Sequence, residues 1–199
     1  MTEPTTGGKL SRKQQAEETR LLVFNTALSL LEERDFEEIT IRDIVKAAGV
    51  SIGTFYNYFS SKLDVYYETY FLADAYFEEE VAPLLTQPTL RERLLFLFDR
   101  YAAYSSEITS MSLTKILYNS NNKHFMRQTD TGIIPVLTRT LQQGMDSGEL
   151  VCEESATEIA SFLMIAARGQ VYDWCIHDGS YILREAMAGM IGKLLRIYL

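Results

Sequence analysis

One stretch of 20 residues constrains the fold of this chain more than any other: Thr40 to Phe59 reads TIRDIVKAAGVSIGTFYNYF. Apolar residues at positions 41, 44, 45 and 48 recur at helical spacing after Thr40, a good N-cap with an acidic residue three positions later. Gly49 follows the last periodic residue, where a helix end needs positive φ. Ser51 then caps a second short helix, in which Phe55 and Phe59 share one face. The stretch therefore predicts a helix-turn-helix.

The second of these helices has an outward face. With Phe55 and Phe59 toward the core, a spacing of 100° per residue places a small cluster outward and on the flanks: Gly53, Thr54, Tyr56, Asn57 and Tyr58. In helix-turn-helix proteins this helix enters the DNA major groove. There asparagine can bind adenine, a threonine methyl can meet thymine, and tyrosine hydroxyls can reach phosphates. The alternative is a short surface helix whose polar residues face solvent by chance.

The flanking sequence extends the pattern with a helix before it and YFSSKLDV, which opens another helix, after it. The residues that carry the pattern are Thr40, Arg42, Asp43, Ile44, Ala48–Ser51, Gly53, Thr54, Tyr56, Tyr58, Phe59, Ser61 and Lys62. In this order and spacing, over about residues 17 to 70, the chain resembles the TetR family of bacterial transcriptional regulators.

The resemblance implies a dimer that binds a partly palindromic DNA operator and responds to a small molecule. Carried onto this sequence, the predicted DNA contacts are Arg42, Ser51, Gly53, Thr54, Tyr56, Asn57, Tyr58 and Lys62. Lys62 opens its helix and is expected to hold a phosphate, with a solvated lysine as the alternative. Many relatives carry a basic residue where this chain has Ile52, so the second helix here is uncharged and lacks that phosphate contact.

The rest of the chain predicts an all-α protein. Residues 1–15 are polar, carry Pro4 and two glycines, and predict a disordered arm. Residues 16–62 form the helix-turn-helix DNA-binding domain, with its first helix over Glu17–Arg34, and residues 63–199 form a helical ligand-binding and dimerisation domain. A single long helix is expected from Ser61 to about Pro83.

Composition narrows the function classes. The net charge of −8 lies mainly in the second domain, because residues 1–62 hold eight Lys and Arg against nine Asp and Glu. DNA binding therefore rests on specific contacts rather than on a basic patch. No signal peptide or membrane-spanning run is present, which favours the cytoplasm and argues against a membrane partner. No nucleotide-binding, hydrolase or metal-binding motif occurs, so we expect no enzyme, no catalytic residue, no metal and no cofactor.

The last two long helices carry many small residues, among them Ala160, Ala167, Gly169, Gly189 and Gly192. Small residues allow close helix approach, either in a monomer core or between protomers. In the family that the chain resembles, these two helices form a four-helix dimer interface, which predicts a homodimer here.

The middle helices are rich in large, adaptable side chains. Aromatic and apolar walls are typical of ligand pockets, although a helical core has the same composition. The predicted ligand-binding residues are Phe96, Tyr101, Tyr104, Met111, Tyr118, Phe125, Met164, Tyr172 and Trp174. Such walls predict an apolar or aromatic effector, with Asp173, Glu107 and His177 as candidate polar anchors.

The sequence thus favours a ligand-responsive regulator, most simply a repressor that releases its operator when the small molecule binds. The uncharged recognition helix and the acidic body leave an alternative from another class. In that alternative the chain is a degenerate family member that acts as a protein-interaction coactivator with little DNA affinity of its own.

Overall fold

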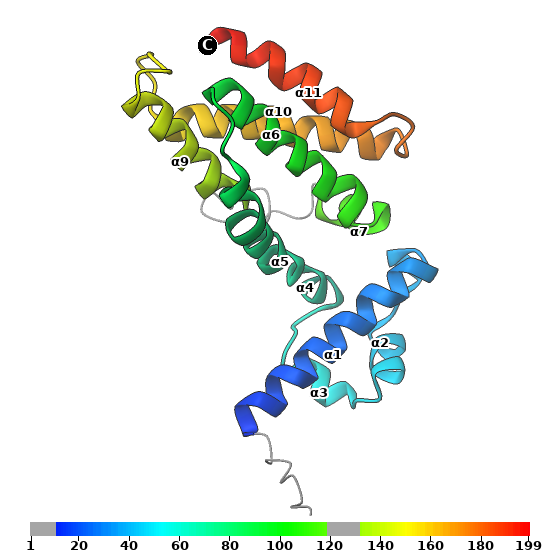
Figure 1. Cartoon of the computed structure of the whole chain (residues 1–199). Coiled ribbons are helices and arrows are strands. Elements are labelled where there is room, and N and C mark those ends of the chain that lie inside the picture. The colour runs from blue at the N-terminus through cyan, green and yellow to red at the C-terminus, as the bar shows by residue number, and fades with distance from the viewer. Residues whose placement is uncertain (1–10, 119–131) are drawn as a thin grey trace, which may run out of the picture. The chain divides into compact units, whose positions relative to one another are not determined.

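The computed structural model describes residues 11–118 and 132–199 (Figure 1). The chain divides into two compact units, whose boundary along the sequence lies between Glu68 and Thr69. Within the described ranges the secondary structure consists of helices and contains no strand, which confirms the all-α prediction.

The N-terminal unit is built on one long helix that packs against two short ones. Its elements are α1 (Arg12–Glu33), the 3₁₀ turn η1 (Phe36–Glu38), α2 (Ile41–Ala48), α3 (Ile52–Tyr56) and α4 (Lys62–Tyr67). Helix α1 packs on α2 and α4, and α2 packs on α3. The fully buried side chains between them include Val23, Ala27, Ile44, Phe55, Phe59, Val65 and Tyr66. The Tyr66 hydroxyl donates to the Ala27 carbonyl at 3.1 Å and so ties α4 to α1.

Helix α1 begins earlier than the sequence pattern indicates. Ser11 accepts a hydrogen bond from the backbone of Gln14, and the Gln14 side chain accepts one from the Ser11 N–H, a capping box that starts the helix at Arg12. The predicted arm over residues 1–15 is therefore wrong for residues 12–15, which are helical, and its first ten residues lie outside the described ranges. Within α1, Leu21 is 47% exposed, whereas Val23 is fully buried.

The C-terminal unit contains the remaining elements. These are α5 (Thr69–Ala75), η2 (Tyr76–Val81), η3 (Ala82–Leu84), α6 (Leu90–Ala103), η4 (Tyr104–Ile108), α7 (Met111–Leu117), α9 (Ile133–Asp146), α10 (Ala156–Ile176), α11 (Leu183–Leu194) and η5 (Leu195–Ile197). Helix α6 packs against α9 and α11, and α10 packs against both of these as well. Their shared core is aliphatic, with Leu94, Leu97, Leu137, Leu163 and Ile191 fully buried.

The single long helix expected from Ser61 to Pro83 is instead divided. Its first part stops before Glu68, whose N–H donates to the carbonyl three residues back, at Val65, so that the α-helical hydrogen-bond pattern breaks there. A π-helical turn, η2, then follows α5, and η4 is a second π-helical turn at the end of α6. Local sequence spacing gives no sign of these two wider turns.

Candidate functional site

The turn between α2 and α3 is fixed by local chemistry. Thr40 and Asp43 form a capping box at the start of α2, with the Asp43 N–H donating to the Thr40 hydroxyl at 3.2 Å. Gly49 ends α2 with φ +68°, a left-handed conformation that glycine adopts at little cost. Ser51 caps α3 by accepting from the Thr54 N–H at 3.0 Å. The predicted helix-turn-helix is confirmed.

The outer face of α3 presents the side chains expected from the helical spacing. Phe55 and Phe59 are buried in the core of the unit, whereas Gly53, Tyr56 and Asn57 are exposed. Thr54 and Tyr58 are half-buried. We call this outward set, with Ile52, the recognition surface. Ile52 is 47% exposed and adds an apolar side chain to it.

Two exposed positive charges stand on α2, the helix that packs on α3. Arg42 and Lys46 are both exposed and stand four residues apart, hence on one face of that helix. The hydroxyl of Ser51, by contrast, is already engaged, since it lies 2.8 Å from the Thr54 hydroxyl and caps α3. Ser51 therefore serves to position α3.

Lys62, predicted as a phosphate contact, has a different place. Its ammonium donates to the carbonyls of Phe36 at 2.5 Å and Ile39 at 2.7 Å, and lies 3.9 Å from the centre of the Phe36 ring. Burial lowers the pKa of this lysine, and the charge of Glu37 opposes that shift. In this structure the side chain closes the segment before α2 onto the start of α4.

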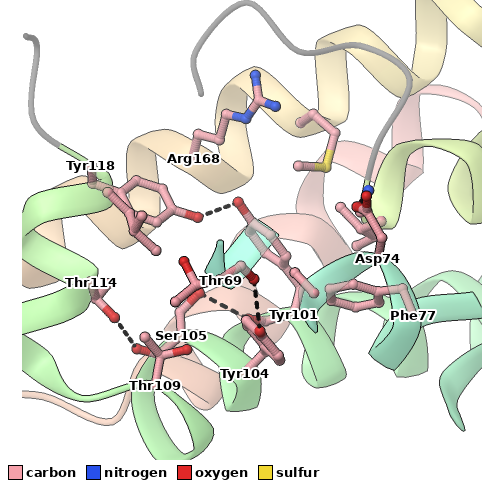
Figure 2. Close-up of a pocket in the computed structure, with 15 residues that line it drawn as sticks. Thr69, Asp74, Phe77, Tyr101, Tyr104, Ser105, Thr109, Thr114, Tyr118 and Arg168 are labelled. Carbon is pink, nitrogen blue, oxygen red and sulfur yellow. Dashed lines mark hydrogen bonds between the residues drawn. The ribbon is translucent and has the colours of Figure 1, made fainter. Parts of the chain in front are cut away.

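The C-terminal unit contains a pocket enclosed by α5, η2, α6, η4, α7, α9 and α10 (Figure 2). About 610 Å³ of empty space lies within it, including open solvent at its mouth. Its lining residues are Thr69, Ala73, Asp74, Phe77, Tyr101, Tyr104, Ser105, Thr109, Thr114, Leu117, Tyr118, Gly132, Ile133, Met164 and Arg168.

The two π-helical turns form part of this wall. Phe77 of η2 lies 5.8 Å, centroid to centroid, from the ring of Tyr104 in η4 and 6.3 Å from that of Tyr101. The carbonyl of Ser105 in η4 accepts the Thr114 hydroxyl at 2.8 Å. The Thr114 side chain of α7 thus supplies a hydrogen-bond donor to a backbone carbonyl of the wider turn η4. This bond holds the turn in a form that keeps aromatic rings and hydroxyls facing the pocket.

Hydroxyl groups in the pocket are largely bonded to one another or to backbone. The Tyr101 and Tyr118 hydroxyls share a short hydrogen bond, which Figure 2 shows across the pocket. The Tyr104 hydroxyl donates to the Thr69 carbonyl at 3.5 Å. Burial raises the pKa of each of these three tyrosines, that of Tyr104 to about 12, so all are neutral near pH 7.

Comparison with known proteins places the helix-turn-helix in a family. Residues 23–68 match the family described as bacterial regulatory proteins, tetR family. EthR of Mycolicibacterium smegmatis, a transcriptional regulator, is 40% identical over 58 residues, which cover 29% of this chain and 27% of EthR. AcrR of Shigella flexneri, another regulator, is 35% identical over 63 residues, or 32% of this chain and 29% of AcrR. Residues 23–68 thus form a TetR-family domain. The aligned segment spans under a third of these curated relatives.

Solved structures of TetR-family proteins resemble the chain over most of its length. The FadR repressor of Thermus thermophilus, in complex with lauroyl-CoA, has a TM-score of 0.71 and 26% identity, covering 89% of this chain and 92% of FadR. FadR of Bacillus subtilis, in complex with stearoyl-CoA, has a TM-score of 0.68 and 21% identity, covering 88% and 96%. At 21% identity, the likeness to the Bacillus subtilis protein concerns the fold alone.

The pocket in the C-terminal unit contains some of the predicted ligand residues and not others. Tyr101, Tyr104, Tyr118 and Met164 line it, and Phe125 lies outside the described residues. Four others lie elsewhere: Phe96 beneath Arg100, Met111 near Gly179, Trp174 against Tyr181, and Tyr172 exposed on α10. Their composition suits a pocket, but helical spacing alone does not reveal which buried face meets empty space.

The polar residues of the pocket differ from the anchors suggested by the sequence. Asp173 accepts the Tyr181 hydroxyl at 2.8 Å, Glu107 pairs with Arg184, and the His177 ring bonds to the Asp173 carbonyl, all outside the pocket. Arg168 and Asp74 line it instead. Arg168 stands in α10 four residues after Met164, on the same helical face, which is the one sequence signal that could have indicated it.

An apolar stripe runs along the exposed face of α10. Phe162, Ile165, Tyr172 and Ile176 are all more than 40% exposed, and Gly169 lies between them at the alternating spacing of three and four residues. A methyl group added at Gly169 would meet no atom within 4 Å. Ile182 and Ile197, at the two ends of α11 and its extension, are exposed too.

Residues 11–118 and 132–199 contain neither a metal-binding cluster nor a membrane-spanning helix. No group of three or more His, Cys, Asp and Glu side chains in these ranges is arranged to hold a metal ion. No helix there combines the length and hydropathy needed to cross a membrane. Cys175 is buried, which raises the pKa of its thiol to about 11, and Cys152 is half-buried.

Proposed function

We propose that this protein is a ligand-responsive transcriptional repressor that binds a palindromic DNA operator as a dimer. The observation that carries the proposal is the recognition surface: an α3 held by Gly49 and Ser51 with Tyr56 and Asn57 exposed on its outer side. A helix presented in this way can enter the major groove and contact base edges. The proposed base and phosphate contacts are Gly53, Thr54, Tyr56, Asn57, Tyr58 and Arg42, with Ser51 and Lys62 in positioning roles.

The exposed charges predict how this binding depends on salt. Arg42 and Lys46 are exposed cations on α2, whereas Ile52 occupies an uncharged position on α3. Because each neutralised phosphate contributes about 0.9 to the slope of log affinity against log salt, two cations per protomer predict a shallow slope of about −4 for a dimer. Specific contacts then contribute most of the discrimination between sequences.

The apolar stripe on α10 supports the dimer. An exposed row of large apolar residues at heptad spacing is unfavourable in water and is typical of a helix that packs on another. Gly169 in the middle of the row allows close approach. We propose that α10 and α11 of two protomers pack together, so that the two recognition surfaces reach successive turns of DNA.

The pocket is the proposed effector site. Its first lining residue along the chain, Thr69, follows directly on Glu68, the last residue of the N-terminal unit. Glu68 is itself paired with Arg20 of α1. A ligand that displaces Thr69 therefore acts on the residue next to an ion pair of the DNA-binding unit. Induction requires only that the ligand binds better to the form that does not fit the operator.

Selection of bound duplexes from a random DNA pool tests the proposal. The expected result is an enriched inverted repeat with half-sites about one helical turn apart. Tyr56→Phe and Asn57→Ala are each expected to weaken binding to it, while Asn25→Ala, at an exposed position of α1, serves as the matched control. Absence of any enriched sequence would refute operator binding and favour the protein-interaction alternative.

A further inference from the structure

Two charged side chains, Asp74 and Arg168, are found among the described lining residues of the pocket. They act on different tyrosines. The positive charge of Arg168 counteracts the effect of burial on the pKa of Tyr101 and Tyr118, whereas the negative charge of Asp74 adds to it at Tyr104. Figure 2 shows the same division, with Arg168 above the paired hydroxyls and Asp74 beside Phe77. The pocket therefore has a positive end and a negative end.

The negative end has a structural task. The Asp74 carboxylate accepts a short hydrogen bond from the backbone N–H of Gly132, which has φ +63° and precedes α9. This bond fixes the start of α9 against α5. A ligand anion placed here would meet the repulsion of Asp74, so an anionic group is directed toward the other end.

The positive end combines three groups that suit an oxyanion. The guanidinium of Arg168 offers donors in a planar fork that matches a carboxylate. The hydroxyls of Tyr101 and Tyr118, which bond to each other, are neutral and can turn a hydrogen toward an acceptor. Around them the wall is apolar, with Phe77, Leu117, Ile133 and Met164 in the lining.

From this arrangement we infer that the pocket binds an amphipathic organic carboxylate. Its carboxylate would lie at Arg168 and the Tyr101–Tyr118 hydroxyls, and its hydrocarbon or aromatic body against Phe77, Ile133 and Met164. The inference rests on the proposed function in taking this pocket as the effector site. It commits to the free acid, because an amide or thioester presents a neutral carbonyl that makes poorer use of a guanidinium.

Titration calorimetry on the full chain without DNA tests the inference. The probes are decanoate and 4-phenylbutyrate, each with its primary amide, and decanoyl-CoA. At least one acid is expected to bind at least about tenfold more tightly than its own amide, and decanoate more tightly than decanoyl-CoA. Equal binding of acid and amide, tighter binding of decanoyl-CoA, or no binding of either acid would overturn the inference.

Variants locate the interaction. Arg168→Gln is expected to weaken binding of the acid about tenfold or more and to leave that of the amide unchanged, while Tyr118→Phe gives a smaller loss. Arg139→Gln, on α9 and paired with Glu78 outside the pocket, is the matched control and should change neither. If Arg168→Gln folds poorly, Arg168→Lys keeps the charge without the fork and should retain part of the preference. An acid preference that survives both substitutions would contradict the assignment.

The two proposals fail separately. The DNA selection uses ligand-free protein and the calorimetry uses no DNA. Loss of the acid preference would leave operator binding standing, and absence of an operator would leave a carboxylate-binding pocket standing.

Discussion

Replacing Lys62 with methionine distinguishes two roles for a residue that the sequence predicts as a phosphate contact. Methionine keeps much of the apolar stem and removes the ammonium. In the structure that ammonium donates to two backbone carbonyls, those of Phe36 and Ile39, at 2.5 and 2.7 Å and lies over the Phe36 ring. The substitution therefore leaves two carbonyl oxygens without these donors.

The size of the effect follows from these contacts. Hydrogen bonds that involve a charged group contribute about 1.5–3 kcal/mol each, and a cation–π contact about 0.5–1 kcal/mol. The cost of burying the ammonium, which also lowers the pKa of Lys62, offsets part of this gain. We expect Lys62→Met to lower the free energy of unfolding by about 2–3 kcal/mol.

The assay needs a probe of the N-terminal unit. The one tryptophan, Trp174, lies in the other unit, so its fluorescence is not suitable. Amide hydrogen exchange measured by mass spectrometry over α2 and α4 reports on the unit itself. The control is Lys46→Met, an exposed lysine of α2, which should change stability by less than about 0.5 kcal/mol.

Salt dependence of DNA binding separates the roles. A phosphate contact, when removed, lowers the slope of log affinity against log salt by about 1 per half-site, and we expect this for Lys46→Met but not for Lys62→Met. Unchanged exchange rates in Lys62→Met together with a reduced slope would refute the structural role and restore the phosphate contact.

Three further predictions concern the turn, the pH dependence and the dimer. Gly49→Ala should destabilise the N-terminal unit by about 1–2 kcal/mol because φ at Gly49 is +68°. Gly53→Ala, inside a helix and with space for a methyl group, should instead stabilise the unit by up to about 1 kcal/mol. Amide hydrogen exchange over α2 and α3 measures both effects, and equal effects would contradict the conformational argument. The hydrogen bond from its N-cap threonine holds the pKa of Asp43 below the ordinary 3.8, so its contribution to stability is present above that pH and is lost as the pH falls through the folded-state value. Acid unfolding of Asp43→Asn should accordingly show a shallower loss below about pH 4, and an unchanged acid limb would exclude this role. Ile165→Glu places a charge in the apolar stripe and should convert dimer to monomer in sedimentation velocity, whereas the same change at Val151, an 84% exposed residue outside the stripe, should not.

Local chemistry made the helix-turn-helix predictable. Thr40, Gly49 and Ser51 each act within four residues of their own position, so the sequence contains the whole of the argument for the turn and the caps. The helical repeat alone was enough to predict that Phe55 and Phe59 share one face. Capping boxes of the same local kind start α6 at Thr89 and α10 at Ser155.

The pocket was less predictable because it depends on distant packing. Tyr101 and Phe96 stand on one helix and have similar character, yet only Tyr101 faces the empty space, since its neighbours come from η2 and α7. Arg168 escaped notice for the same reason. Its place one turn after Met164 gives no indication of the tyrosine pair, 50 and 67 positions away, whose pKa values its charge affects. Similarly, Lys62 acquires its partners 23 and 26 positions earlier in the chain.

The joint between the two units has a consequence for engineering. Thr69 accepts the Tyr104 hydroxyl through its backbone carbonyl, and Glu68 is paired with Arg20 through its side chain, so two neighbouring residues serve different units. A carbonyl is present whatever the side chain, and hence the contact at Thr69 survives a change of sequence there. A chain cut and rejoined between these residues keeps both contacts intact. Hybrid sensors that graft this pocket onto a foreign DNA-binding head of the same family should therefore be spliced after position 68, with no spacer added.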